Sequence, residues 1–116
     1  MLPPRIAKKG NRSDRWKSTS HCNFIRSHQC CVPGCDRRPI EVAHLRKGTD
    51  AAMGRKASDF FAISLCAYHH RADQHLNGED SFAQAHGIDL HALAEAFAKA
   101  SPKAAEIARI RKERGL

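Results

Sequence analysis

Four potential metal ligands occur in this chain as two short pairs separated by residues 36–65. Cys30 and Cys35 form the first pair, and Cys66 and His69 form the second. A structural zinc ion takes four tetrahedral thiolate or imidazole ligands, usually supplied as two close pairs joined by a longer segment. The pattern therefore predicts one zinc site, which any fold of this chain must bring together.

The first pair leaves one alternative open. Cys31 is adjacent to Cys30 and could bind the metal with Cys35 in its place. We favour Cys30, because Cys31 can turn away into a small core. Pro33 and Gly34 lie between the two candidate ligands and suit a tight turn that aims two thiolates at one point.

The cysteine count also bears on the compartment. Five cysteines are an odd number, and residues 1–5 carry a positive charge without the apolar segment of a secretory signal. Reduced or metal-bound thiols are therefore expected, with Cys22 as the spare. No window approaches the roughly 18 apolar residues of a membrane span. We expect a cytoplasmic protein with no membrane partner.

The positive charge is concentrated at the two ends of the chain. The net charge is +8; residues 1–20 hold six Lys or Arg against one acid, and residues 103–116 hold five against two. Basic ends beside a neutral middle suit contact with a phosphate backbone, although they could also be solvated ends. We predict a flexible basic arm over 1–20, one domain over 21–100, and a basic C-terminal helix over 101–116.

Apolar patterning predicts two strands followed by helices. Residues 40–45 alternate and place His44 on one face with Ile40 and Val42, and residues 60–65 form a second apolar strand. A two-stranded hairpin is not stable alone and must pack on a helix. Four helices are expected. They cover residues 66–77 and 80–86, a segment that begins after Asp89 as its N-cap, and residues 104–114.

Three histidines matter as a combination more than singly. Each of His44, His70 and His75 alone could be an ordinary surface or hydrogen-bonded side chain. His70 adjoins a predicted zinc ligand at the start of a helix, His75 follows on that helix, and His44 lies on the strand expected to face it. Three imidazoles are therefore expected to converge beside the hairpin.

These motifs resemble those of the HNH (His-Asn-His) endonucleases. The resemblance is carried by residues 43–45 (AHL), 53–59 (MGRKASD) and 65–75 (LCAYHHRADQH), and it covers about residues 21–100. Within that family the chain is most similar to the zinc-stapled subgroup found in phages and prophages, which includes recombination-associated nucleases.

The resemblance implies an α+β fold, with a small ββα-metal core, a structural zinc knuckle and added C-terminal helices. It implies that His44 is the general base for phosphodiester hydrolysis and that Asp59 takes the place of the middle Asn, which orients the base. It also implies that His70 and His75 bind a catalytic Mg²⁺, Mn²⁺ or other divalent cation. The Zn²⁺ at the cysteines is structural.

Two positions depart from the family pattern. Many members have an additional metal ligand directly before the base, where this chain has Ala43. His70 and His75 are five positions apart, which is about 140° round an ideal α-helix. His70 could pair with Asp73 as a ligand set, or a local bulge could bring His75 back to the same face.

The expected partner is DNA in a bacterial cytoplasm, near the nucleoid, with a recombinase or other phage or host DNA-processing protein as a further partner. Five basic residues could hold phosphates, with little sequence specificity: Arg46, Lys47, Arg55, Lys56 and Arg71. Two other functions stay open. One is a catalytically inactive zinc-stapled DNA-binding module, and the other is a protein-interaction adaptor in a phage assembly.

Overall fold

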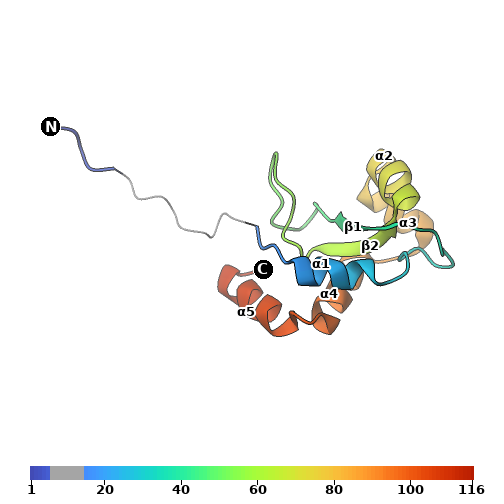
Figure 1. Ribbon diagram of the computed structural model, residues 1–116. Coiled ribbons are helices and arrows are strands. Elements are labelled where there is room, and N and C mark those ends of the chain that lie inside the picture. Colours follow the sequence, from blue (N-terminus) through green and yellow to red (C-terminus); the bar gives the residue numbers. More distant parts are fainter. Residues whose placement is uncertain (6–14) are drawn as a thin grey trace.

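The fold is mixed α/β, with one small sheet surrounded by helices (Figure 1). It is a computed structural model, and it describes residues 1–5 and 15–116. The elements follow in the order α1 (Thr19–Arg26), β1 (Ile40–His44), β2 (Ala62–Cys66), the π-helix η2 (Tyr68–Gln74), α2 (His75–Asn77), α3 (Glu79–His86), α4 (Leu90–Ala100) and α5 (Ala104–Arg114).

The sheet is the antiparallel hairpin that the alternating pattern predicts. Ile40 pairs with Cys66 at one end, and His44 pairs with Ala62 at the other. Ala43 is fully buried in the core, whereas its neighbour His44 is only partly buried. This difference follows from the alternation of side chains across a strand.

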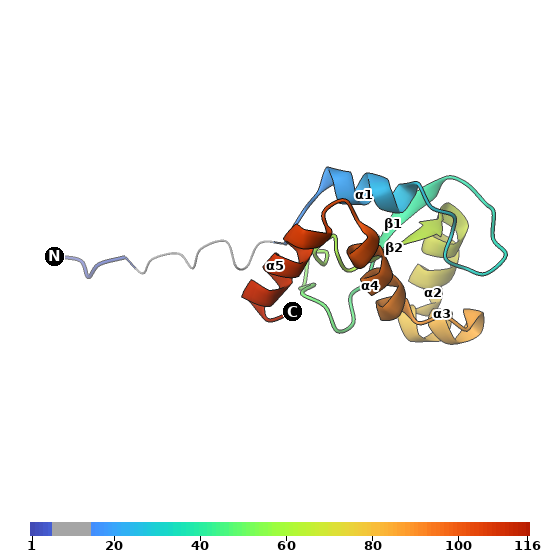
Figure 2. The same cartoon turned by 90° about the horizontal axis from the view of Figure 1, so that it is seen from below.

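The main core lies between the hairpin and the helices that follow it. Leu45, Ile63 and Leu65 from the hairpin region pack with Phe82 of α3 and Leu90 of α4. Helices α1 and α4 lie alongside the strands. The helices η2, α2 and α3 lie at the end of the hairpin where β2 finishes (Figures 1 and 2). Burying each such side chain contributes about 1.5–3 kcal/mol. The helices thus hold both ends of β1 and β2 in place.

A second core cluster joins the two ends of the chain. Trp16 packs with Phe60, Phe61 and Ile107 of α5. The Trp16 backbone also donates to the Ser58 hydroxyl. Residues 15–18, near the end of the predicted basic arm, therefore contact the domain.

Helix α1 is an element that the sequence patterning did not predict. Ser18 is its N-cap, and the Ser18 hydroxyl accepts a hydrogen bond from the backbone N–H of His21. His21 and Ile25 are four residues apart and buried, which is the spacing of a helix face. Ser18 at the cap position, followed by His21 and Ile25 at helical spacing, is the sequence signal that could have located α1.

The C-terminal helices lie close to their predicted bounds. The Asp89 carboxylate caps α4 by accepting from the N–H of Ala92, and α5 covers 104–114 as expected. Gly87 ends α3 in the left-handed conformation that glycine adopts without strain. Within residues 1–5 and 15–116, no helix has the length and apolar character needed to cross a lipid bilayer.

Candidate functional site

The four ligands predicted for zinc lie together at one end of the hairpin. One ligand atom from each of Cys30, Cys35, Cys66 and His69 lies within 4.8 Å of all the others. Cys66 is the last residue of β2, and His69 is in the first turn of η2. The turn before β1 supplies the other two thiols. The hairpin and the turn therefore assemble a group that could hold a metal such as zinc.

The separations between these atoms fit a tetrahedral ion. Zinc bonds of about 2.3 Å to sulfur and 2.0 Å to nitrogen would separate two ligand atoms by about 3.5–3.8 Å. The His69 Nδ1 atom lies 3.2 Å from the Cys66 sulfur and 3.5 Å from the Cys30 sulfur. The sulfurs of Cys35 and Cys66 are 3.9 Å apart. A small rearrangement of side chains would complete the coordination.

The alternative ligand Cys31 is occupied elsewhere. Its sulfur lies 3.4 Å from the Ser64 hydroxyl, and its backbone N–H donates to the Ser64 carbonyl oxygen. Cys31 is absent from the ligand group, which includes Cys30. The structure therefore brings together the set that the sequence analysis favoured.

The free thiols have different acidities. Burial raises the pKa of Cys30 to about 11. Burial also acts to raise the pKa of Cys35, but hydrogen bonds from the Arg37 backbone and from Cys30 and Cys66 outweigh it and lower that pKa. Metal binding must therefore displace a proton from Cys30, as thiolate coordination generally does.

Asp73 and His86 lie directly behind the imidazole of His69. Ligand atoms of these three residues lie within 4.8 Å of one another. The His86 Nε2 atom is 2.7 Å from the Asp73 carboxylate, and this contact is the largest cause of the lowered pKa of Asp73. Nδ1 of His69 lies near the sulfurs of Cys66 and Cys30, so a carboxylate lies close to a candidate ligand ring. Asp73 is four residues after His69, and residues four apart are neighbours on a helix surface. This spacing is the sequence signal that could have placed Asp73 near His69.

The predicted general base contacts its predicted orienting residue. The Nε2 atom of His44 is 2.8 Å from the Oδ1 atom of Asp59. In the described part of the chain, His44 has no other hydrogen-bond partner. The carboxylate thus fixes the ring through Nε2 and leaves Nδ1 for a ligand.

Several donors surround the carboxylate of Asp59. The backbone N–H of Ser18 donates at 2.8 Å, the Cys22 thiol at 3.3 Å and the Arg15 guanidinium at 3.2 Å. Burial would raise the pKa of Asp59, but the hydrogen bond from His44 and these neighbours outweigh it and hold the pKa at about 2. Asp59 is therefore negatively charged wherever the protein is folded near neutrality. Nothing in the local sequence linked residues 15–22 to it.

Burial and the nearby Asp59 charge raise the pKa of Cys22 to about 11. The thiol therefore stays protonated and donates to the carboxylate. Cys22 was expected to be the spare cysteine, and it is a half-buried side chain outside the metal group.

His70 contacts a carboxylate that the sequence did not indicate. Its Nδ1 atom lies 2.8 Å from the Oε1 atom of Glu41 on β1. The hydrogen bond from His70, together with Arg71, lowers the pKa of Glu41. A carboxylate that accepts from one imidazole nitrogen orients the ring, an arrangement common behind metal-binding histidines.

The helix after β2 starts with a π-helical segment, which changes the spacing of its histidines. A π-helix closes i→i+5 hydrogen bonds and holds more residues per turn than an α-helix, so residues five apart lie closer to one face than they do in an α-helix. Residues 68–74 are in η2, and His75 begins α2. The π-helical segment therefore reduces the angular separation of the backbone positions of His70 and His75. The side chain of His75 lies outside the described residues.

His44 and His70 face a common groove of about 550 Å³, which we call the histidine groove. Its lining also includes basic and acidic side chains from the loop after β1 and from the start of α3. The lining residues are Val42, His44, Arg46, Lys47, Lys56, Ala57, His70, Gln74, Gly78, Glu79 and Asp80.

The five basic residues predicted to hold phosphates are not equivalent. Arg46, Lys47 and Lys56 line the histidine groove, whereas Arg55 and Arg71 do not. Four of the five have intramolecular partners: Arg46 with the Ala52 carbonyl, Lys47 with Asp80, Arg55 with the Asp50 carbonyl and Arg71 with Glu41. Their DNA contacts stay a prediction.

Two features bear on the ligand set for a catalytic cation. Ala43 is fully buried in the core, so the position before the base points away from the groove. Asp73 is engaged by His86 and Asn77, which argues against the alternative pairing of His70 with Asp73. Glu41 is the carboxylate that His70 contacts instead.

Comparison with known proteins gives one match. A family model described as "Protein of unknown function (DUF968)" matches residues 3–102. No curated protein and no solved structure matches the chain.

Proposed function

Since the chain belongs to the DUF968 family of proteins of unknown function, its role is inferred from its site, and we propose that it is a metal-dependent HNH endonuclease. The proposed reaction is hydrolysis of DNA phosphodiester bonds, by nicking or cutting. The proposed setting is a bacterial cytoplasm, at the DNA, beside a recombinase or other phage or host DNA-processing protein.

One contact carries the proposal. His44 lies in the histidine groove with Nε2 bound to Asp59, 2.8 Å away. A general base needs an imidazole held in one orientation with its second nitrogen toward the substrate. A histidine held by a charged carboxylate beside an open groove meets that requirement.

The proposed steps follow from this arrangement. Nδ1 of His44 removes a proton from a water molecule in the groove, and the water oxygen attacks the phosphorus. The bond between the phosphorus and the leaving oxygen breaks, and that oxygen takes up a proton from solvent. The imidazole becomes positively charged, and the Asp59 carboxylate stabilises that charge across the Nε2 hydrogen bond. Arg15 remains beside Asp59 and keeps it ionised.

The proposed catalytic cation would be held by His70 and His75 on the helix. The observed donors fit such an ion in one respect, because the Glu41 carboxylate contacts Nδ1 of His70 and orients its ring, as carboxylates do behind metal-binding histidines. Imidazole ligands suit transition metals such as Zn²⁺, Fe²⁺ or Ni²⁺ better than Mg²⁺. When bound, a cation of this kind neutralises charge on the phosphate and on the leaving oxygen.

We assign Zn²⁺ to the four-residue group of Cys30, Cys35, Cys66 and His69. Three thiols and one imidazole are typical of a closed structural zinc site. The role proposed for it is to fix η2, which carries His69 and His70 next to each other. The boundary between the structural and the catalytic metal site would then fall within this dipeptide.

The test uses supercoiled plasmid incubated with the zinc-loaded protein and either Mg²⁺ or Mn²⁺. We expect nicked or linear product from the wild type, and a rate about 10²–10⁴-fold lower for His44→Ala. His91→Ala is a matched control, because it removes an imidazole outside the lining of the histidine groove. Intact plasmid with both wild type and His44→Ala would refute the nuclease.

A second function has one specific observation in its favour. The position that often supplies an extra metal ligand is Ala43, and its side chain is buried. A zinc-stapled DNA-binding module without catalysis would have this feature. Retardation of DNA on a gel without cleavage under any tested cation would support that function over the nuclease.

A further inference from the structure

A second concavity has a lining that shares no residue with the histidine groove. It has a volume of about 870 Å³ and lies between the end of α1, the turn that carries Cys35 and the start of β1. We call it the arginine hollow. Its lining consists of Arg26, Ser27, His28, Gln29, Asp36, Arg37, Arg38, Pro39 and Ile40.

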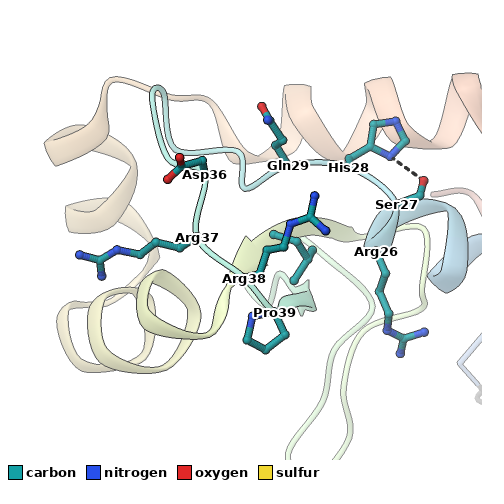
Figure 3. Close-up of a pocket in the computed structure, with 9 residues that line it drawn as sticks. Arg26, Ser27, His28, Gln29, Asp36, Arg37, Arg38 and Pro39 are labelled. Atoms are coloured by element: carbon teal, nitrogen blue, oxygen red, sulfur yellow. Dashed lines mark hydrogen bonds between the residues drawn. The ribbon is translucent and has the colours of Figure 1, made fainter.

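The arginine hollow has three formal positive charges and one negative charge, that of Asp36. Figure 3 shows Arg38 pointing into the hollow between Gln29 and Ser27, with Arg26 and Arg37 extending to either side. Guanidinium groups spread in this way suit successive phosphates of a chain more than one isolated phosphate.

None of these guanidinium groups is neutralised by a carboxylate in the described part of the chain. Arg26 donates to the amide oxygen of Asn23, which is neutral. Arg37 lies over the ring of Tyr68, 4.6 Å from its centroid, which holds the side chain without cancelling its charge. Arg38 has no partner among residues 1–5 and 15–116.

The histidine groove differs in this respect. Lys47 is paired with Asp80 at 2.5 Å, and Glu79 accepts from the backbone of Arg46. Arg71, near the groove, is paired with Glu41. Carboxylates thus offset much of the positive charge there. The arginine hollow therefore has more positive side chains without a carboxylate partner than the histidine groove has, among the described residues.

Both concavities open along the same strand. Ile40 lines the arginine hollow, and Val42 and His44 line the histidine groove. These residues alternate along β1 and share one face. Four residues of a strand span about 13 Å. One DNA strand advances about 3.4 Å per nucleotide along its axis, so a bound DNA could reach both places within a few nucleotides.

We propose that the arginine hollow is a second DNA-backbone site, which takes phosphates a few nucleotides from the phosphodiester bond beside His44. This assignment deepens the proposed nuclease function and rests on it for the position of the cut. Its contacts are electrostatic, so the hollow adds affinity and orientation without reading sequence.

The test measures DNA affinity against salt concentration. All proteins carry His44→Ala, so the DNA stays intact, and a duplex long enough to cover both concavities is used. Arg26→Gln with Arg38→Gln should reduce the slope of log K against log salt by about 1.8, since each duplex phosphate contact contributes about 0.9. Lys99→Gln with Lys103→Gln, an equal loss of charge at the exposed junction of α4 and α5, should change the slope by less than one contact.

Zinc content and melting temperature are measured for each variant, which separates lost contacts from lost folding. Equal slopes for the arginine pair and the lysine pair would overturn the proposal. If inorganic phosphate at matched ionic strength abolishes the effect of the arginine pair, the hollow takes a free anion and the DNA assignment is wrong. A reduced slope in a protein whose wild type cuts no plasmid would refute the nuclease alone.

Discussion

The Nε2 atom of His44 and the Oδ1 atom of Asp59 are 2.8 Å apart, although the residues are 15 positions apart in the chain. The N-terminal segment also holds Asp59, through Arg15 at the same oxygen and through the backbone of Ser18 at Oδ2. Three parts of the chain therefore meet at one carboxylate. The N-terminal segment, which no motif covers, supports the proposed base.

Asp59→Asn tests whether this carboxylate supports catalysis. An amide keeps the shape but cannot stabilise a positive imidazole, so plasmid cleavage should fall by about 10²-fold or more. Zinc content should not change, because Asp59 is not part of the ligand group. Arg15→Gln is the graded comparison, with a smaller fall expected because the carboxylate remains. Cleavage by Asp59→Asn at the wild-type rate would remove Asp59 from the mechanism.

The low pKa of Asp59 gives a prediction about stability and pH. Its folded value of about 2 lies below the ordinary value of 3.8. The stabilisation from its charge is therefore complete above about pH 4 and is lost as the pH falls toward 2. The difference in melting temperature between wild type and Asp59→Asn should stay constant from pH 5 to 8. A difference that shrinks from pH 8 to 6 would show that burial dominates and that the pKa is raised.

Cys66→Ser should abolish zinc binding and cooperative unfolding. The free energy of binding a structural zinc ion is folding free energy, about 10–16 kcal/mol in zinc-finger peptides. Metal analysis and thermal melting report the two effects. Cys31→Ser is the matched control, since its sulfur contacts Ser64 and not the ligand group. A Cys66→Ser protein that melts like wild type without zinc would contradict the metal site.

Asp73→Asn should weaken zinc binding without removing a ligand. Asp73 and His86 lie beside the His69 ring, and a carboxylate behind a metal-binding imidazole orients it and raises its basicity. Loss of such a partner typically costs about 10–100-fold in metal affinity. Competition with a coloured chelator measures this, and Co²⁺ substitution reports the ligand geometry.

Asp80→Asn is the matched control for that experiment. Asp80 is an exposed carboxylate paired with Lys47 and lies outside both metal groups in the described chain. Equal zinc affinity for Asp73→Asn and Asp80→Asn would show that Asp73 only holds α3 in place through His86.

The sequence predicted most of the local structure. Both strands of the hairpin, the turn that carries Cys30 and Cys35, and the cap at Asp89 depend on neighbours in the chain, so pattern and spacing locate them. Helix α1 was missed because its apolar positions are few. The Ser18 cap and the spacing of His21 and Ile25, which are buried against the domain, were its only local signals.

The helix after β2 shows a different limit. An ideal α-helix places residues 70 and 75 on different faces, and the observed π-helical segment reduces the angle between their backbone positions. A π-helix is strained relative to an α-helix and is maintained by its surroundings. Here the group of Cys66 and His69 with the two thiols before β1 and the contact of Asp73 with His86 supply such surroundings, which a local pattern does not contain.

The sequence by itself determined the identity of the candidate ligands and the base. Cysteine and histidine spacing and strand alternation are properties of neighbouring residues, and they placed Cys30, Cys66 and His44 correctly in the fold. The family resemblance already paired Asp59 with His44. Only the tertiary structure decided that Glu41 contacts His70 and that Asp73 lies near His69, because packing sets which side chains meet, and burial makes such polar groups costly unless they are paired.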